Sequence, residues 1–177
     1  FSDDKKTGLW SQWSKDGQKT REVTYEEGKK QGPATEWYEN GQMKALGDFA
    51  DDEKDGEWTR WHENGQKQCD YHWNEGVTAD GVITFWHDNG RKAAEITFKN
   101  GKKHGPAPGW RENGQRMGTI HYEEGRKVSG ESFDGDGRKE GDFTWQGESP
   151  KMVNKPEPKV VRKPVASTME LQLKATG

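Results

Sequence analysis

The stretch GEWTRWHENGQK, at positions 56–67, contains the pattern that decides the fold. It opens on a glycine and reaches an Asn-Gly pair nine residues later, at Asn64-Gly65. Asn-Gly and Asp-Gly are the strongest short signals for a β-hairpin, because both residues accept a positive φ. We therefore interpret this stretch as a strand followed by a tight turn, after which a second strand returns.

The same pattern recurs along the chain in steps of 24 or 25 residues. The opening glycine, taken here as position 0 of each repeat, is found at Gly8, Gly32, Gly56, Gly81, Gly105 and Gly130. A third glycine near position 20 marks a second turn in most repeats, although Asp51-Asp52-Glu53 replaces it in the second repeat. A period of this length predicts about six tandem 24-residue β-hairpins. We expect the last, from Gly130 to about Gly147, to be shortened and degenerate, as terminal repeats often are.

The returning strand alternates between apolar or small residues at positions 13, 15 and 17 and mostly polar residues between them. A period of two with one apolar face is typical of a half-buried antiparallel strand. Position 17 is aromatic in each of the first five repeats: Tyr25, Phe49, Trp73, Phe98 and Tyr122.

Tryptophan stands at position 5 in the same five repeats: Trp13, Trp37, Trp61, Trp86 and Trp110. A two-residue turn would send this side chain to the face opposite positions 15 and 17. A three-residue turn closed by a left-handed glycine, with its usual bulge, would place all three positions on one face. We favour the second geometry, because the first would expose a column of tryptophans. The two aromatic rows are then predicted to form one buried structural ladder.

These patterns predict an all-β chain, an elongated single-layer antiparallel meander of tandem hairpins. We divide it into a repeat array over residues 1–147, a linker rich in Pro and Lys over 148–166, and a strand-like tail over 167–177. In the tail, Met169, Leu171 and Leu173 alternate with polar residues. An open meander leaves two unpaired edges, so we expect the tail to pair with its own sheet or with that of another copy.

The composition narrows the class of function. The 177 residues are 27% hydrophobic and 33% charged, with a formal net charge of −3 and no basic stripe before residue 150. Nucleic-acid binding is therefore not expected, and no apolar run is long enough for a transmembrane helix. The chain opens on Phe1-Ser2 without Met, so we expect a processed or excised piece, which is compatible with an exported or cell-surface protein.

Two features of the sequence resemble metal sites, but neither supplies a full set of ligands. Four of the five histidines fall at repeat-equivalent positions that lie strands apart, His62 with His87 and His72 with His121, where they cannot converge on one ion. The run from Asp134 to Gly137 resembles the first half of a calcium loop, but Phe143 stands where the bidentate glutamate is needed. We predict no metal and no cofactor, and we interpret the run as a loop in the last repeat.

The motif G-x-W-x-x-W-x-x-[DN]-G-Q-K, followed by an aromatic residue and x-x-G-K, resembles the MORN-repeat variant family. The resemblance covers residues 8–129 strongly and 130–147 weakly. It implies a β-hairpin repeat fold, and it supplies no catalytic residues. Proteins similar to this one are often described as antitoxins or immunity proteins, which implies binding of a protein toxin. Related arrays are linked to scaffolding and membrane association.

We predict a protein-binding module and not an enzyme, because no nucleophile, base and cleft can be assembled from these residues. Its partner would be another protein or a second copy, bound through a sheet face or edge, with the antitoxin-like role as the specific version. One alternative is a structural or cell-surface scaffold. The other is a carbohydrate or choline-like ligand module that uses Trp10 and Trp58, which stand at position 2 and are expected on the exposed face.

Overall fold

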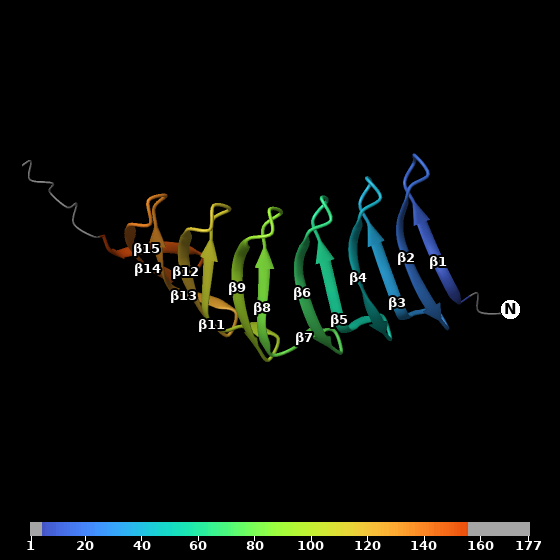
Figure 1. Ribbon diagram of the computed structural model, residues 1–177. Coiled ribbons are helices and arrows are strands. Elements are labelled where there is room, and N and C mark those ends of the chain that lie inside the picture. Colours follow the sequence, from blue (N-terminus) through green and yellow to red (C-terminus); the bar gives the residue numbers. More distant parts are fainter. Residues whose placement is uncertain (1–4, 156–177) are drawn as a thin grey trace, which may run out of the picture.

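The computed structural model describes residues 5–155, which form one open antiparallel sheet (Figure 1). The strands follow one another in chain order, so each hairpin lies beside the next and the chain never crosses over. Two short strands, β7 and β10, pair only with β6 and β9 respectively. The strands are β1 Gly8–Trp13, β2 Lys19–Glu26, β3 Lys29–Trp37, β4 Met43–Ala50, β5 Glu53–Trp61, β6 Lys67–Asn74, β7 Val77–Thr78, β8 Gly81–Trp86, β9 Lys92–Lys99, β10 Lys102–Lys103, β11 Gly105–Trp110, β12 Arg116–Glu123, β13 Arg126–Phe133, β14 Lys139–Gln146 and β15 Ser149–Asn154.

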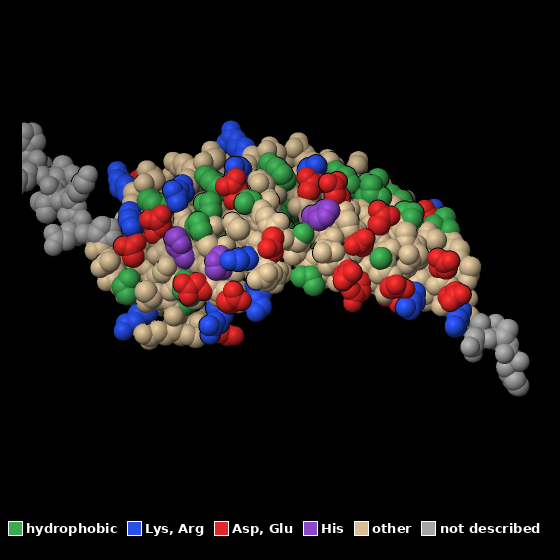
Figure 2. Space-filling model, turned by 90° about the horizontal axis from the view of Figure 1, so that it is seen from below, with side chains coloured by type: hydrophobic (Ala, Val, Ile, Leu, Met, Phe, Trp, Pro, Cys, Tyr) green, Lys and Arg blue, Asp and Glu red, His purple; other side chains and the backbone are tan. Residues whose placement is uncertain are grey.

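The predicted all-β meander of tandem hairpins is confirmed. The six hairpins are β1–β2, β3–β4, β5–β6, β8–β9, β11–β12 and β13–β14. Seen from its lower edge, the elongated sheet bends along its length, and acidic and basic side chains intermingle on its surface (Figure 2). Among the residues described, no helix is long and apolar enough to cross a membrane.

The sixth hairpin is complete, and the sheet continues beyond it. The turn from Asp134 to Gly137 has the hydrogen bonds of the turn from Ser14 to Gly17, so this repeat starts at Val128 and Phe133 takes the place of the position-5 tryptophan. Strand β15 then pairs with β14. The predicted end of the array at residue 147 is therefore wrong, because residues 149–154 belong to the sheet. As the last described strand of the sheet, β15 tolerates Pro150, which cannot donate a backbone hydrogen bond.

Both predicted kinds of turn are present. In the first hairpin the Ser14 N–H donates to Gln18 O at 2.7 Å, the Gly17 N–H donates to Ser14 O at 3.1 Å, and Gly17 has a φ of 81°. This is the three-residue turn that we favoured from the sequence. The turns between hairpins have two residues, and Asp51 and Asp52 form one with φ values of 49° and 74°. Aspartate tolerates this region, so the missing glycine does not break the pattern.

A second irregularity, just beyond the turn, determines which side chains lie on each face of the sheet. Trp13 lies opposite Lys19, whereas Gln12 lies opposite Arg21, so Thr20 is an extra residue in the returning strand. Such a β-bulge shifts the alternation of one strand against the other. The prediction that positions 5, 15 and 17 share one face is therefore wrong. The same shift occurs in every hairpin, and the extra residues are Thr20, Lys44, Gln68, Ala93, Met117 and Glu140.

Positions 2, 4, 13, 15 and 17 lie on one side of the sheet, which we call the core face. Trp10 is paired directly with Val23, and Trp58 with Tyr71, so positions 2 and 15 are cross-strand neighbours. All buried hydrophobic side chains among the described residues stand at these positions: Val23, Ala34, Ala45, Phe49, Trp58, Cys69, Ile83 and Tyr122.

One close contact of the core face places a tryptophan on a glycine. The Trp58 ring meets Phe49 edge to face at 5.1 Å between centroids, and its Nε1–H donates to Asp48 O at 2.8 Å. A β-carbon on Gly47 would stand 2.2 Å from the Trp58 ring, so only glycine fits there. The same contact between the first two repeats pairs Val23 with Ala34. The equivalent contact between repeats is therefore filled by a glycine and a tryptophan in one place and by a valine and an alanine in the other.

The position-5 tryptophans lie on the opposite side, which we call the outer face. Trp13, at the open edge, is 58% exposed, and the other four are half-buried. The residue that follows each of three of these tryptophans hydrogen-bonds to the next repeat. Tyr38 donates its hydroxyl to Trp61 O at 2.8 Å, and the Nε2 atoms of His62 and His87 lie 2.8 and 2.9 Å from Trp86 O and Trp110 O. These bonds join consecutive repeats close to the turn edge of the sheet.

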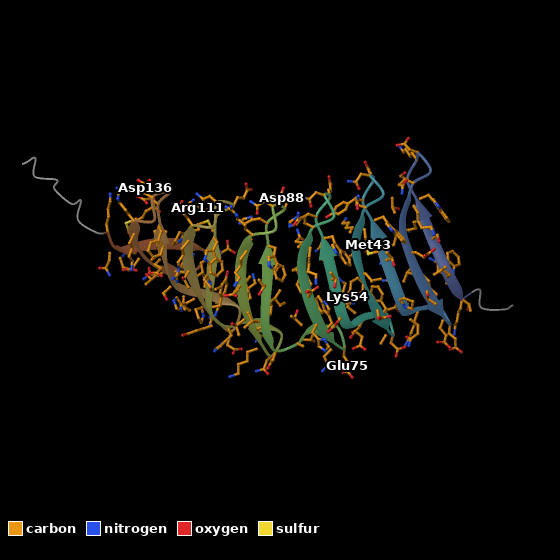
Figure 3. The ribbon with its side chains drawn as sticks, viewed as in Figure 1. Met43, Lys54, Glu75, Asp88, Arg111 and Asp136 are labelled. Atoms are coloured by element: carbon orange, nitrogen blue, oxygen red, sulfur yellow. The ribbon has the colours of Figure 1, made fainter. Side chains whose placement is uncertain are left out.

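The turn edge of the sheet holds a second series of such bonds. The side-chain amides of Asn40, Asn64 and Asn89 each donate to a backbone carbonyl of the following turn, at 2.8, 2.6 and 3.0 Å. Their oxygens accept the N–H of the residue two places later in their own turn. Figure 3 shows Asp88 and Asp136 along this edge, and Glu75 at the opposite edge. The asparagine of the Asn-Gly pair therefore closes one turn and ties it to the next.

The face assignment can be tested with two tryptophans. Replacing Trp58, which is 3% exposed, by alanine removes a buried aromatic and should lower the free energy of unfolding by about 3–5 kcal/mol. Replacing the exposed Trp13 by alanine should cost less than about 1 kcal/mol. Urea denaturation of the two variants measures both losses, and equal losses would show that the faces are assigned wrongly.

The exchange of large and small side chains predicts that Gly47 and Trp58 are coupled. Gly47→Val alone should destabilise the sheet, because its side chain would overlap the Trp58 ring. The double variant G47V/W58A copies the pair Val23 and Ala34, so it should lose less stability than the two single changes summed, by at least about 1 kcal/mol. A double-mutant cycle in urea measures this coupling, and strict additivity would mean that the two positions do not touch.

Candidate binding face

The core face holds an open groove over its C-terminal half. The groove has a volume of about 380 Å³ and crosses strands from β9 to β15. Apart from Thr119, Glu131 and Ser132, the residues that line it are apolar or glycine: Ala93, Ala94, Ile96, Ala107, Pro108, Gly109, Met117, Gly118, Ile120, Tyr122, Phe143, Trp145 and Pro150. An open apolar groove of this kind is the usual form of a binding site.

Small residues in the middle of the face create the groove. Ala94, Gly109 and Gly118 are successive neighbours across β9, β11 and β12, and Ala107 stands where the third repeat carries Trp58. Large side chains remain on either side of this row, with Met117 at 49% exposure on its rim. The first three repeats fill the same space with their own aromatic rings. The two halves of the core face therefore differ, since one is packed and the other is open.

A row of alternating aromatic and lysine side chains runs along one margin of the core face. In register order, Tyr25 lies opposite Lys30, Phe49 opposite Lys54, Phe98 opposite Lys103, and Tyr122 opposite Lys127. Thr78, opposite Trp73, is the one place among these pairs where lysine is replaced. We call this the lysine–aromatic row. Sequence reasoning missed it, although lysine two residues before the opening glycine, as in Lys30 and Lys54, was a visible signal.

Each of these lysines reaches over an aromatic ring of the following repeat. Ring centroids lie within cation–π range of the ammonium groups. The distances are 5.0 Å from Lys30 to Phe49, 5.3 Å from Lys54 to Trp73, 5.3 Å from Lys103 to Tyr122 and 5.9 Å from Lys127 to Trp145. Lys6 occupies the same place at the start of the array, 5.1 Å from Tyr25. The aromatic rings thus hold the ammonium groups in a line.

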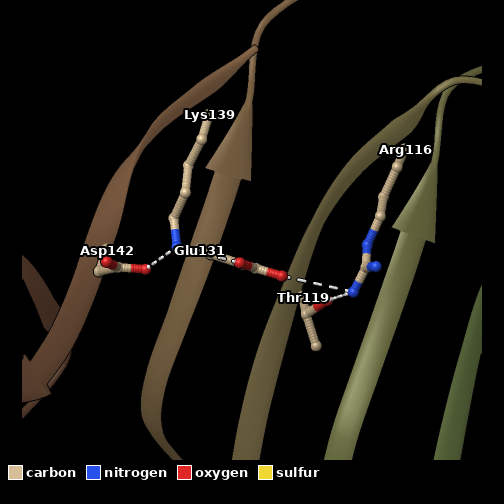
Figure 4. A network of polar contacts seen from close by, with 5 residues as sticks. All are labelled: Arg116, Thr119, Glu131, Lys139 and Asp142. Atoms are coloured by element: carbon tan, nitrogen blue, oxygen red, sulfur yellow. Dashed lines mark hydrogen bonds and ion pairs between the residues drawn. The ribbon is translucent and has the colours of Figure 1, made fainter. Parts of the chain in front are cut away.

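Lysines on the two faces differ in whether they have ion-pair partners. On the outer face, four lysines each pair with the carboxylate three residues later: Lys19 with Glu22, Lys67 with Asp70, Lys92 with Glu95 and Lys139 with Asp142. Figure 4 shows the last of these pairs, extended through Glu131 to Arg116. Within residues 5–155, none of the five lysines of the lysine–aromatic row has an ion-pair partner, in contrast to these four. The four outer-face lysines are neutralised locally, and the lysines of the lysine–aromatic row are not.

Burial of the core face also changes the chemistry of its central groups. Desolvation lowers the pKa of Lys54, and the nearby Arg60 and Arg21 guanidinium groups add to this effect while Glu36 opposes it. Burial and the hydrogen bond with Cys69 raise the pKa of Tyr71 to about 12, and burial raises the pKa of the Cys69 thiol. The tyrosine and the cysteine are therefore neutral at physiological pH, and the charge at this point of the face comes from Lys54, Arg60 and the pair Arg21 with Glu36, 3.7 Å apart.

The residues predicted to bind a partner are placed differently from the expectation. Trp58 is buried, and the Lys54 ammonium lies 4.1 Å from its centroid, so the prediction that it forms an exposed platform is wrong. Trp10 shares the core face, not the opposite one, and is 44% exposed at the open edge with Lys6 4.7 Å from its ring. Met169, Leu171 and Leu173 lie outside the described residues. Of the predicted ladder, only the position-17 row belongs to the core face.

The residue types that bind metals are dispersed over the described part of the sheet. Within residues 5–155, no three His, Cys, Asp or Glu side chains lie close enough together to hold a metal ion. The loop that resembles a calcium site is the turn of the sixth hairpin, and Asp134 Oδ1 accepts the N–H groups of Asp136 and Arg138 there.

The comparison with known families agrees with the repeat geometry. The family described as the MORN repeat variant matches residues 30–51, 54–75 and 79–100, three consecutive segments. The first two begin at Lys30 and Lys54, which are members of the lysine–aromatic row, and the third begins one residue after Thr78. A comparison with curated proteins finds no match. Three tandem segments of this array thus match the MORN repeat variant.

Proposed function

We propose that the array is a non-enzymatic binding module that holds a segment of another protein on its core face. The observation that carries this proposal is the open apolar groove over β9 to β15. A concave site lined mainly by apolar side chains with a few polar groups is the usual form of a binding pocket. In this sheet the packed half supplies stability, and the open half leaves apolar surface that a partner would cover.

The shape of the groove supports a polypeptide segment as the ligand. The groove crosses several strands and is open along its length, so an elongated chain can lie in it. Most of its lining carries no ionisable group, which leaves little to act as an acid, base or nucleophile. The carbohydrate or choline-like alternative loses its support, because the Trp58 ring is buried and the Trp10 ring faces the ammonium of Lys6.

The antitoxin-like role is the specific version of this proposal. It rests on the resemblance of the repeat motif, and it would make the bound segment part of a protein toxin. The scaffold alternative is a weaker explanation, because a passive spacer needs no gap in its core face. Self-association through the edges is a third possibility, since β1 and β15 each pair with a single strand among those described.

Substitutions at two residues of similar exposure test the two faces separately. Met117→Glu places a charge on the rim of the groove, at the position where the sixth repeat already carries Glu140. Leu46→Glu places the same charge on the outer face, where Leu46 is 42% exposed and other repeats carry Glu22 or Glu95. Neither change should lower the free energy of unfolding by more than about 1 kcal/mol.

The chain should enrich a family of related peptides from a displayed random-peptide library. We expect M117E to bind them at least about tenfold more weakly, because a buried unpaired carboxylate costs more than about 1.4 kcal/mol. L46E should bind as the unaltered chain does. Equal binding by M117E, or loss of binding in L46E alone, would contradict the assignment of the groove. Light scattering of the free chain decides whether the partner is a second copy.

A further inference from the structure

We propose that the segment bound on the core face is acidic as well as apolar, with carboxylates that pair with the lysine–aromatic row. The inference rests on the proposed binding function and names the chemistry of the partner. It starts from an asymmetry: a chain with a net charge of −3 carries, on one face, a line of lysines that no carboxylate within residues 5–155 neutralises.

The unpaired lysines are not explained by the stability of the fold. An exposed cation–π contact contributes about 0.5–1 kcal/mol, which a purely apolar side chain over the same ring would also approach. The outer face shows that these repeats readily place a carboxylate three residues after a lysine, as in Lys67 with Asp70. On the core face, the burial that lowers the pKa of Lys54 opposes its charge. A bound carboxylate would replace the water that Lys54 has partly lost.

The row has a defined spacing, which the partner must match. Successive lysines are two strands apart, except where Thr78 interrupts the row, so their ammonium groups repeat at about 10 Å. A segment in the polyproline II conformation that runs across the strands advances about 3.1 Å per residue with three residues per turn, so every third side chain meets the row. A helix advances 1.5 Å per residue and meets it about once in every seven residues. Either segment would place its apolar residues in the groove beside the row.

Other occupants fit these observations less well. The segment after residue 155 carries Lys159, Arg162 and Lys163 in its first half, so its charge has the same sign as the row. A membrane would need several adjacent protruding apolar side chains, but Phe49, Trp58 and Tyr122 on this face are buried, and the exposed Trp10 and Met117 lie far apart on β1 and β12. Binding of single-stranded nucleic acid uses aromatic rings that are free to stack, and the rings of the row lie beneath lysine side chains.

The test compares two sets of three substitutions that change the net charge equally. The core variant is K54Q/K103Q/K127Q, and the matched outer variant is K67Q/K92Q/K139Q. The probe is a synthetic copy of the peptide that the full chain enriches most strongly from the displayed library. A second peptide has glutamine in place of each acidic residue. Fluorescence anisotropy gives the Kd of each peptide for each protein, and urea denaturation confirms that both variants fold.

We expect the enriched peptides to be acidic, with acidic residues recurring every third or every seventh position. The core variant should bind the acidic peptide at least about tenfold more weakly, and the outer variant within about twofold of the unaltered chain. The glutamine peptide should bind more weakly to the unaltered chain and show no further loss with the core variant. That control does not depend on the stability of the variant.

Several results would overturn the inference. If the enriched peptides are neutral or basic and their binding still depends on Met117, the proposed binding function stands but the partner is not acidic. Equal losses in the two variants would show that only the total charge matters. A further outcome is that anionic vesicles or duplex DNA bind the unaltered chain more tightly than the peptide does. If the core variant then loses this binding, the ligand is a membrane or a nucleic acid and not a peptide. If no peptide is enriched, the proposed function and this inference both fail.

Discussion

One extra residue in each hairpin determines which side chains meet in this sheet. The bulge stands just beyond the turn, at Thr20 in the first repeat and Met117 in the fifth, and it shifts the alternation of the returning strand. Without it, the position-5 tryptophans would share a face with the aromatic residues of position 17. With it, the tryptophans half-cover the outer face, and the position-2 side chains pack against position 15. The buried contacts, the groove and the lysine–aromatic row all depend on this shift.

Much of the fold could be predicted from the sequence, and the faces could not. Spacing and Asn-Gly pairs are strong local signals, and they predict the hairpins and the three-residue turn. The bulge has no such signal, because residues as different as Lys44, Ala93 and Glu140 occupy it. Gly47 next to Trp58 in space was an available clue, but its meaning depends on knowing that the two positions touch. Counting from Gly130 also misplaced the sixth repeat, which begins at Val128 and includes Phe133 in the role of tryptophan.

The candidate site follows from how the array divides its two faces. The outer face pairs its lysines with carboxylates of the same strand, and amide hydrogen bonds at the turn edge join consecutive repeats. The core face is packed in the first three repeats and open in the later ones. It also keeps charges that the chain does not neutralise within residues 5–155. Sequence reasoning predicted a protein-binding module but chose Trp58 as a contact residue. Counting the alternation of side chains without the bulge had placed Trp58 on the wrong face of the sheet.

The face assignment is the central claim, and nuclear Overhauser effects between side chains test it most directly. The account predicts strong effects between the Gly47 α-protons and the Trp58 indole, together with an upfield shift of those α-protons caused by the ring above them. It also predicts contacts between Trp58 and Phe49. Effects that instead join the Trp61 indole to Phe49 or Trp73 would place the position-5 tryptophans in the core and contradict the account.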